Sequence, residues 1–394
     1  MDDDFSDRAF STRAVWSGTN HLEGSAVTPI FTTSTYQLND GRYRDWADGG
    51  QHSLIYSRWS SVNSEAVASK VASLEGAEDG ETLASGMAAI SATLLSMLSK
   101  GDHMVTSADI YGGTYGLLTS DFPRFGIDVT MADIRDPSSF EAAINENTKV
   151  LYVETITNPV LKVCDLEAMA SIAKEHGLIS VVDNTFATPW ACQPISMGFD
   201  VVIHSGTKFL NGHTDLTAGI VVGRADLIEG VFKTKTRLGG TADAFMCYLL
   251  ERGMRTLHVR MPIHASNSSE LARRMQEHPE ISAVNHPSLE SYADYEVAKR
   301  IVPKGTGMLS FVVKGGDERA MRFVRALDII FEATSLGGIE SLVSCPFNTS
   351  DIFVPEEDRL EAGIVPGFVR MSVGIEDVDD LWSDIEQALS ASQS

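Results

Sequence analysis

Between about residues 65 and 225, short apolar runs alternate with segments of helical length, and this alternation restricts the fold more than any other feature. The runs are rich in β-branched residues, and two of the segments between them, Met87–Leu98 and Leu166–His176, are expected to be helices. Nearly unbroken apolar strands separated by helices predict an α/β fold, with a mainly parallel sheet covered by helices on both faces. The predicted strands are Thr82–Ser85, His103–Thr106, Val129–Met131, Val150–Val153, Ile179–Val182, Val201–His204 and Ile220–Val222.

The rest of the chain predicts two flanking regions around a main domain at 56–250. Residues 1–55 hold few periodic segments and are expected to form an extended arm that lies on its own body or on a second subunit. Residues 251–263 have apolar side chains at helical spacing and are expected to form a connector helix. The remainder predicts a smaller C-terminal α/β domain over 251–394, from an amphipathic stretch at 265–278, strands at 308–313 and 368–373, and a helix at 377–391.

Composition narrows the class of partner. The chain has 31 basic and 54 acidic residues, a formal net charge of −23 that repels phosphate backbones and anionic lipid. We therefore expect neither nucleic acid nor a membrane surface as a partner. No basic-then-apolar leader, membrane-length apolar run or C-x-x-C pair occurs, which predicts a soluble cytoplasmic protein with reduced thiols and no metal site. The four cysteines are Cys164, Cys192, Cys247 and Cys345.

A turn of small residues joins the first predicted strand to the helix after it. Ser85, Gly86 and Met87 stand at this junction. Free backbone N–H groups and the positive end of the helix dipole make such a turn suitable for a phosphate. A Ser-Gly turn is also an ordinary helix N-cap, so the pattern alone leaves both interpretations open.

Polar residues follow two further predicted strands at the same edge of the sheet. Asp183 either caps the next turn or pairs with a buried cation, such as a protonated pyridine nitrogen. Ser205, Thr207 and Lys208 form either a surface turn or a set of phosphate-binding hydroxyls beside an imine-forming amine. No G-x-x-x-x-G-K-[ST] or G-x-G-x-x-G sequence occurs, which disfavours a nucleotide-binding fold without catalysis.

Taken together, these residues predict a site for pyridoxal 5′-phosphate (PLP). That cofactor needs a phosphate cradle, an acid facing its ring nitrogen and a lysine that joins its aldehyde. Asp183 would keep the ring nitrogen protonated, because a nearby negative charge favours the cation. Tyr111, after the His103–Thr106 strand, is a candidate to stack on the ring, or else an ordinary half-buried tyrosine.

Two segments, 181–189 and 204–208, resemble the Cys/Met-metabolism PLP-dependent enzymes. That family includes cystathionine γ-synthase, cystathionine γ-lyase, methionine γ-lyase and the O-acylhomoserine sulfhydrylases. The resemblance covers nearly the whole chain and implies the type I fold of PLP-dependent transferases. Further matching segments are Tyr56-Ser57-Arg58, Ser85-Gly86-Met87, Tyr111-Gly112-Gly113-Thr114, Asn158-Pro159, Ser335-Leu336-Gly337-Gly338 and residues 369–377.

The resemblance also implies roles for individual residues. Lys208 would be the Schiff-base lysine and proton shuttle, and Asp183 the partner of the ring nitrogen. Arg370 with Ser335 would take the substrate carboxylate, a task that suits the planar guanidinium fork. The remaining implied contacts are Ser85, Gly86, Met87, Ser205 and Thr207 at the phosphate, Tyr111 at the ring and leaving group, Asn158 at the 3-oxygen or substrate, and Tyr56 and Arg58 at the phosphate of a neighbouring subunit.

Because Tyr56 and Arg58 would bind the phosphate of a neighbouring subunit, the resemblance implies a homo-oligomer. We expect a tetramer built from dimers, with the N-terminal arm on the neighbouring subunit.

The chain departs from the family pattern at Ser61-Val62-Asn63 and at Thr349-Ser350-Asp351. Cystathionine enzymes commonly carry an arginine and a glutamate where this chain has Gly116 and Thr334. Methionine γ-lyases lack both charges too, but place a cysteine at the position of Gly113.

These differences bear on the reaction. Without the two charges, the far amino-acid head of cystathionine has no partner, a loss that discriminates strongly between substrates. We therefore expect γ-elimination on a small sulfur amino acid such as methionine or homocysteine, with Gly113, Gly116 and Thr334 bearing on specificity. The alternatives are a γ-replacement transferase of the cystathionine γ-synthase or O-acylhomoserine sulfhydrylase type, and a cystathionine γ-lyase.

Overall fold

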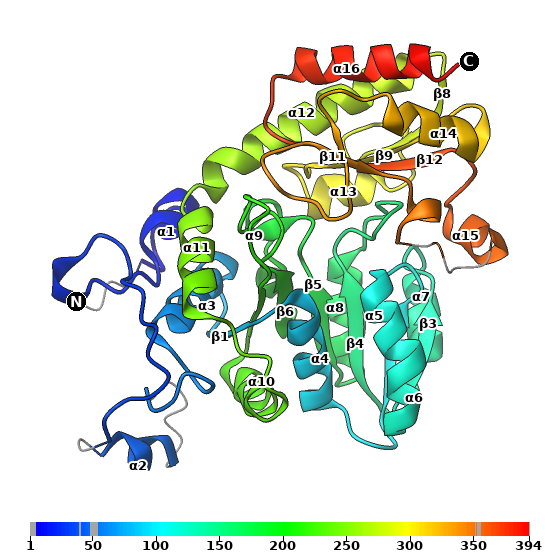
Figure 1. The fold of residues 1–394 in the computed structure, drawn as a ribbon. Helices are drawn as coiled ribbons and strands as arrows, with labels where there is room; N and C mark the ends of the chain where they lie inside the picture. The colour runs from blue at the N-terminus through cyan, green and yellow to red at the C-terminus, as the bar shows by residue number, and fades with distance from the viewer. Residues whose placement is uncertain (1–4, 39–40, 48–53, 351, 353–355, 394) are drawn as a thin grey trace.

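The computed structural model describes residues 5–38, 41–47, 54–350, 352 and 356–393. They form two α/β units, each built around its own sheet, with the larger unit below the smaller one in Figure 1. The predicted fold class, a mainly parallel sheet covered by helices with a smaller sheet domain, is confirmed.

The larger unit contains a seven-stranded sheet in the order β1-β7-β6-β5-β4-β2-β3. Only β7 runs against its neighbours, since it pairs antiparallel with both β1 and β6, whereas the other pairs are parallel. Each predicted strand is present, with each bound moved by at most three residues. The strands are β1 Asp79–Leu83, β2 His103–Ser107, β3 Asp128–Ala132, β4 Thr148–Glu154, β5 Ile179–Asp183, β6 Val201–Ser205 and β7 Gly219–Gly223.

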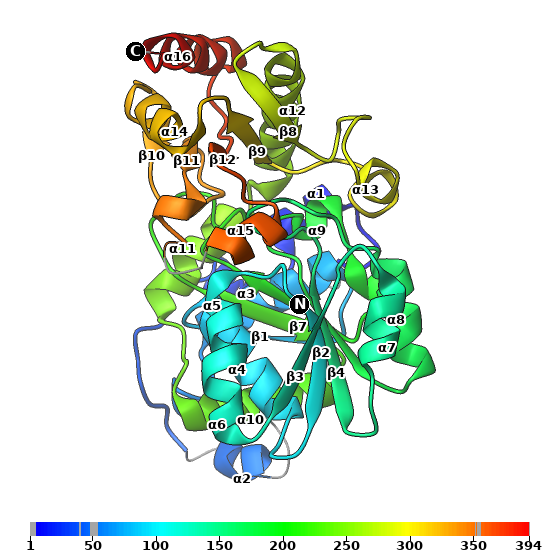
Figure 2. The same ribbon diagram turned by 90° about the vertical axis from the view of Figure 1, so that its right-hand side faces the viewer.

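Alternate side chains of these strands enter two different cores, because successive residues of a strand point to opposite faces. In β4, Val150 and Tyr152 join one hydrophobic cluster, and Leu151 and Val153 join the other. Both faces are therefore covered by helices, as Figure 2 shows. One face carries α4 Gly86–Met97, α6 Phe122–Phe125 and α10 Ala225–Leu238, and the other carries α3 Val62–Glu75, α7 Pro137–Ala143 and α8 Leu166–Glu175.

The smaller unit has a five-stranded sheet in the order β10-β11-β12-β9-β8. Its pairs are antiparallel except for β10 with β11. Its strands are β8 Ile281–Asn285, β9 Met308–Val313, β10 Phe331–Glu332, β11 Leu342–Ser344 and β12 Phe368–Ser372. Its helices are α12 Leu257–Glu277, α13 Tyr295–Ile301, α14 Gly316–Arg325, α15 Glu356–Ala362 and α16 Val378–Ala391.

The prediction of a connector helix over 251–263 is wrong. Helix α11, Ala244–Met254, ends there, and α12 begins at Leu257 after a turn at Arg255 and Thr256. The amphipathic stretch at 265–278 continues α12 and is not a separate helix. The apolar spacing is continuous across the turn, so periodicity alone does not reveal the break. The domain boundary that we predict between residues 250 and 251 falls inside α11.

The N-terminal region is only partly extended. Helix α1, Phe10–Trp16, packs against α3 and α12 of the same chain, so this part of the predicted arm lies on its own body. An isolated bridge joins Thr35 to Tyr56, and α2, Arg42–Ala47, lies at the lower left of Figure 1. The remaining elements are α5 Gly112–Gly116, a π-helical turn at Leu117–Asp121, α9 Thr188–Ala191, and 3-10 turns at Leu22–Gly24, Pro194–Met197 and Pro346–Asn348.

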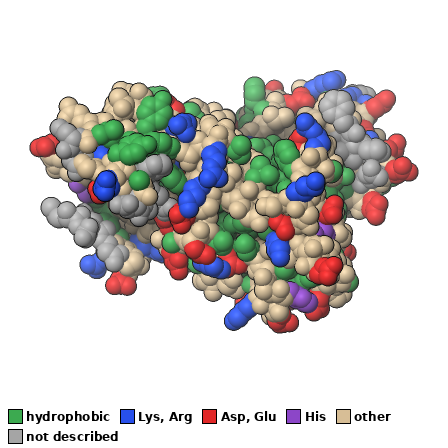
Figure 3. Space-filling model, turned by 90° about the horizontal axis from the view of Figure 1, so that it is seen from below, with side chains coloured by type: hydrophobic (Ala, Val, Ile, Leu, Met, Phe, Trp, Pro, Cys, Tyr) green, Lys and Arg blue, Asp and Glu red, His purple; other side chains and the backbone are tan. Residues whose placement is uncertain are grey.

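The surface and the helices also bear on the expected partners. Lysine and arginine side chains are scattered among acidic ones on the face seen in Figure 3. Among the described helices, none combines the length and the apolar character that crossing a membrane requires.

Candidate active site

A cavity of about 600 Å³ opens at the carboxyl ends of the parallel strands, where the two units meet. This is the edge at which open α/β sheets place their ligands. The cavity is lined by residues from the first turn of α4, from the ends of β4, β5 and β6, and from the smaller unit. The predicted site residues among them are Ser85, Gly86, Met87, Tyr111, Asn158, Asp183, Ser205, Thr207, Lys208, Thr334, Ser335 and Arg370.

Four predicted residues do not line this cavity. Tyr56 and Arg58 lie on the surface, and the Tyr56 side chain is 41% exposed. Gly113 and Gly116 both lie in α5, and a Cβ at Gly116 would meet no atom within 4 Å. Within one chain, Tyr56, Arg58 and Gly116 are absent from the cavity lining, and Gly113 borders it through the side chains of Tyr111 and Met87.

The amino end of α4 forms one wall of the cavity. The Ser85 side chain accepts a hydrogen bond from the Ala88 N–H at 3.1 Å and caps the helix. The N–H groups of Gly86 and Met87 belong to the first turn, where no intrahelical acceptor exists. A Cβ on Gly86 would come within 3.0 Å of the Ser205 hydroxyl oxygen, so glycine is needed for this close approach. The wall thus combines helix-end N–H groups with a serine hydroxyl, as phosphate binding requires.

Asp183 ends β5 beside the cavity. Its Oδ1 accepts a hydrogen bond from the Thr185 N–H at 2.9 Å. Burial raises the pKa of Asp183, while hydrogen bonds from Thr185 and the charge of His204 oppose that rise. A cation bound in the cavity would favour the ionised carboxylate further.

Lys208 follows β6 and points toward the smaller unit. Its Nζ donates to the Ser335 hydroxyl oxygen at 2.6 Å. Burial, together with the nearby Arg370 charge, lowers the pKa of Lys208 to about 8. A lysine with such a pKa has a substantial neutral fraction near neutrality, and the neutral amine is the form that attacks an aldehyde.

Arg370, on β12, is buried, and its guanidinium donates hydrogen bonds to two uncharged oxygens. Its Nη1 donates to Asn158 Oδ1 and its Nη2 to the Ser335 carbonyl, both at 2.9 Å. Ser335 has a left-handed backbone with φ of +83°, which is unfavourable for a residue other than glycine. This conformation lets one residue accept from Lys208 through its hydroxyl and from Arg370 through its carbonyl.

Tyr111 lies at the mouth of the cavity, with its side chain 45% exposed. A Cβ on Gly113 would come within 2.5 Å of the Tyr111 ring and 3.0 Å of the Met87 sulfur. The Tyr111 ring therefore occupies the volume that a side chain at position 113 would need. The backbone N–H of Tyr111 donates to Glu154 Oε1 at 2.7 Å.

Glu154 is a lining residue that the sequence analysis missed. It ends β4 directly opposite Asp183 in the register of β4 with β5. Burial, together with the neighbouring Asp183 charge, raises the pKa of Glu154 well above its usual value, so the protonated form is favoured. Since Glu154 directly follows the predicted strand Val150–Val153, the same inspection of strand ends would have found it.

The two segments that depart from the family pattern have different surroundings. Ser61 caps α3, and Asn63 Nδ2 donates to the Pro29 carbonyl while its Oδ1 accepts from the Phe31 N–H. Neither side chain lines the cavity. Thr349 and Ser350 do line it, and Asp351 lies outside the described residues.

The donor set fits pyridoxal phosphate. The helix end and Ser205 suit a dianionic phosphate, and the buried carboxylate of Asp183 suits a protonated ring nitrogen. Lys208 supplies an amine of lowered pKa in the same cavity.

Comparisons with known proteins agree with this fit. The sequence pattern of the family described as "Cys/Met metabolism PLP-dependent enzyme" matches residues 11–390. L-methionine gamma-lyase of Porphyromonas gingivalis is 39% identical over 389 residues, with 97% of each sequence covered. Cystathionine gamma-lyase of Bacillus subtilis is 40% identical over 368 residues, with 93% of this chain and 94% of that protein covered.

A solved structure extends the similarity to three dimensions. Cystathionine gamma-lyase from Lactobacillus plantarum, complexed with L-serine, superposes with a TM-score of 0.92 at 34% identity. The match covers 98% of this chain and 99% of that one. The chain belongs to the Cys/Met metabolism PLP-dependent enzyme family.

Proposed function

We propose that this chain is a PLP-dependent γ-lyase that removes the sulfur substituent of a small amino acid such as methionine or homocysteine. The observation that supports the proposal is the small set of acidic and basic side chains that line the cavity. Its acidic and basic lining residues, within the described part of the chain, are Glu154, Asp183, Lys208 and Arg370. Three have cofactor or carboxylate roles, and Glu154 holds the Tyr111 backbone. The described lining therefore leaves no charge for a second amino-acid head.

The residues divide the chemistry among them. Pyridoxal phosphate, when bound, supplies an aldehyde for the substrate amine and a cationic ring that accepts electrons from the substrate Cα. Asp183 keeps that ring cationic, and Arg370 binds the substrate carboxylate through its planar fork. Lys208 Nζ removes the Cα proton, a task that suits an amine with a pKa of about 8.

The leaving sulfur needs a proton of its own. Tyr111, at the mouth of the cavity, is the proposed donor through its phenolic O–H. Lys208 Nζ is also the proposed base for one Cβ proton, whose loss lets the Cγ–S bond break, and one water is consumed when ammonia is released. The products are then ammonia, a 2-oxo acid and the departing sulfur group, as methanethiol from methionine or hydrogen sulfide from homocysteine.

The test is a substrate panel with the purified enzyme. L-methionine, L-homocysteine and an O-acylhomoserine are each supplied with and without a thiol, and 2-oxobutyrate, ammonia and thioether products are measured. Release of 2-oxobutyrate from methionine or homocysteine without added thiol supports the lyase. Product that forms only when the thiol is supplied would instead identify a γ-replacement transferase.

Cystathionine is the second candidate substrate, favoured by the Bacillus subtilis relative named cystathionine gamma-lyase. Thr334 lines the cavity without a charge, and Gly116 faces open space. A site without the two charges is expected to prefer methionine, so cystathionine belongs in the same panel. A higher kcat/KM for cystathionine than for methionine would reverse the assignment.

The active unit is proposed to be a homo-oligomer, a tetramer built from dimers that share active sites. Tyr56 and Arg58 are exposed and lie outside their own chain's cavity, as expected if they bind the phosphate of a neighbouring subunit and part of the region 1–55 contacts that subunit. Light scattering gives the subunit number.

The cytoplasm is the proposed compartment, because all four cysteines are buried free thiols, which suits a reducing environment.

A further inference from the structure

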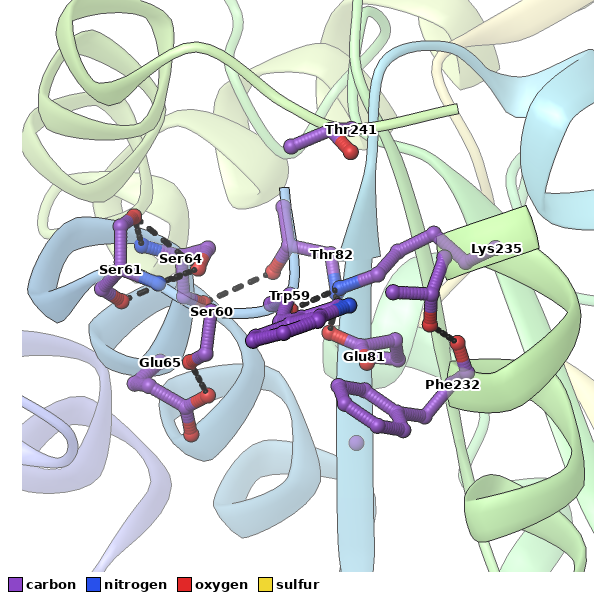
Figure 4. A network of polar contacts seen from close by, with 12 residues as sticks. Trp59, Ser60, Ser61, Ser64, Glu65, Glu81, Thr82, Phe232, Lys235 and Thr241 are labelled. Atoms are coloured by element: carbon purple, nitrogen blue, oxygen red, sulfur yellow. Dashed lines mark hydrogen bonds and ion pairs between the residues drawn. The ribbon is translucent and has the colours of Figure 1, made fainter. Parts of the chain in front are cut away.

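A buried ion pair lies beneath the segment that carries Tyr56 and Arg58. Lys235 of α10 and Glu81 of β1 are joined at 2.8 Å, with side chains only 1% and 7% exposed. The same Lys235 Nζ donates to the backbone carbonyl of Trp59, also at 2.8 Å. Figure 4 shows the lysine extending from its helix between the carboxylate and this carbonyl. One ammonium group therefore connects the sheet, a helix and the surface segment 56–59.

Neighbouring contacts hold the same segment. The Thr241 hydroxyl donates to the carbonyl of Arg58 at 3.1 Å, so two successive carbonyls of the segment are fixed from outside it. The Arg58 Nη1 donates to the carbonyl of Thr236 at 2.8 Å, next to Lys235 in the last turn of α10. The Arg58 guanidinium also lies 5.6 Å from the ring centres of Tyr56 and Trp59. These contacts set the direction of the exposed arginine.

The start of α3 is hydrogen-bonded to β1 next to this ion pair. Ser61 and Ser64 form a capping box, and the Thr82 hydroxyl donates to the Ser64 carbonyl at 2.9 Å. Glu81 and Thr82 are consecutive in β1, so a single strand holds the ion pair on one side and the helix start on the other. Figure 4 shows both sets of contacts around that strand.

Stability alone does not explain such a pair. Removing two charges from water is costly, and buried pairs can often be replaced by apolar side chains without loss of stability. An ion pair fixes a geometry that an apolar contact would leave loose. We infer that Lys235, paired with Glu81, is a positioning residue that orients Tyr56 and Arg58 for the cofactor phosphate of a neighbouring subunit. The inference rests on the shared site of the proposed function.

The first experiment compares cofactor affinity between matched variants. The double variant Lys235→Met/Glu81→Gln removes both charges, so no unpaired charge remains buried. The control is Lys70→Met, which also removes a buried lysine that holds backbone carbonyls, here those of Ala14 and Val15 in α1. Titration of the apoenzyme with pyridoxal phosphate, followed by visible absorbance, gives Kd.

The double variant is expected to raise Kd about tenfold, the size of a lost charge-assisted contact. Lys70→Met is expected to leave Kd within about twofold, because its partners are far from Tyr56 and Arg58. Circular dichroism and the subunit number verify that the variants fold and assemble. An unchanged Kd in a folded double variant, or an equal rise in the Lys70→Met control, would overturn the inference.

The second experiment separates this inference from the proposed function. Subunits with Lys235→Met/Glu81→Gln are refolded together with subunits carrying Lys208→Ala, which cannot perform the chemistry but retain an intact segment 56–59. In mixed dimers the active lysine then receives a correctly held Arg58 from its neighbour, so activity and cofactor affinity are expected to recover. The parallel mixture uses Arg58→Ala in place of the double variant. If only the mixture with Arg58→Ala recovers activity, the role of Lys235 is refuted and the shared site stands. If neither mixture recovers activity, both the role of Lys235 and the shared site are refuted.

Discussion

Lys208 and Lys235 are both withdrawn from water, yet their surroundings differ in kind. Lys208 contacts a neutral hydroxyl, lies near the positive charge of Arg370, and has a pKa lowered to about 8. Lys235 faces the carboxylate of Glu81 and a backbone carbonyl. The first arrangement adds a like charge to the effect of burial on the Lys208 amine, and the second places an opposite charge beside Lys235, which joins the sheet, α10 and the segment 56–59. Burial is the larger cause of the lowered pKa of Lys208, and the neighbouring charge, positive at Lys208 and negative at Lys235, is what distinguishes the two sites.

The strongest test of this comparison is Lys208→Ala. Loss of the amine removes both the cofactor attachment and the base at Cα, so kcat/KM for 2-oxo acid formation is expected to fall by about 10³-fold or more. The free energy of unfolding of the apoenzyme should change little, because Lys208 makes no buried ion pair in the described structure. Full activity in this variant would exclude Lys208 as the reactive amine.

The opposite pattern is expected for Lys235→Met, measured by urea unfolding. A lone carboxylate at Glu81 would remain buried, and breaking such a pair costs about 3–5 kcal/mol. Burial already raises the pKa of Glu81, and Lys235 opposes that rise. The double variant Lys235→Met/Glu81→Gln should therefore recover most of the lost stability. An equal loss in the single and double variants would contradict this explanation.

The strands and most of the cofactor site could be predicted from the sequence because their signals are local. An uncharged β-branched run and the polar residue that ends it are adjacent in the chain, as with Ile179–Val182 and Asp183. The candidate site for the substrate carboxylate depended on resemblance, because Arg370 reaches the cavity from the smaller unit. Glu154 was missed although it obeys the same local rule.

Other features have no local signal. Lys235 and Glu81 lie far apart in the sequence, and each resembles an ordinary surface charge until the fold brings them together. The turn at Arg255 and Thr256 interrupts a continuous apolar spacing, so periodicity predicts one helix where two exist. The proposed contacts of Tyr56 and Arg58 lie on a second chain, which the fold of one chain does not supply.

Glu154 and Asp183 are two buried carboxyl groups whose surroundings also differ. The raised pKa of Glu154 favours a neutral acid that accepts from the Tyr111 N–H, whereas Asp183 is expected to be ionised beside the cofactor. Glu154→Gln retains a neutral acceptor and should change kcat by less than about threefold, while Glu154→Leu should lower it about tenfold by leaving that N–H unsatisfied. Equal losses in both variants would show that the negative charge of Glu154 is needed.

The smallest expected effect is in the pH dependence of cofactor reassociation. Only the neutral Lys208 amine attacks the aldehyde, so the rate constant for binding pyridoxal phosphate to the apoenzyme should rise with pH and level off above a midpoint near 8. For a single titrating amine this corresponds to an increase of about fivefold between pH 7 and pH 8. Arg370→Leu removes a positive charge that lowers the pKa of Lys208, so the midpoint should move to higher pH. Lys70, with a pKa also lowered to about 8 but outside the cavity, provides the control, because Lys70→Met should leave the profile unchanged. A midpoint that does not move in Arg370→Leu would mean that burial alone sets the reactivity of Lys208, and neighbouring charge would then not account for the contrast with Lys235.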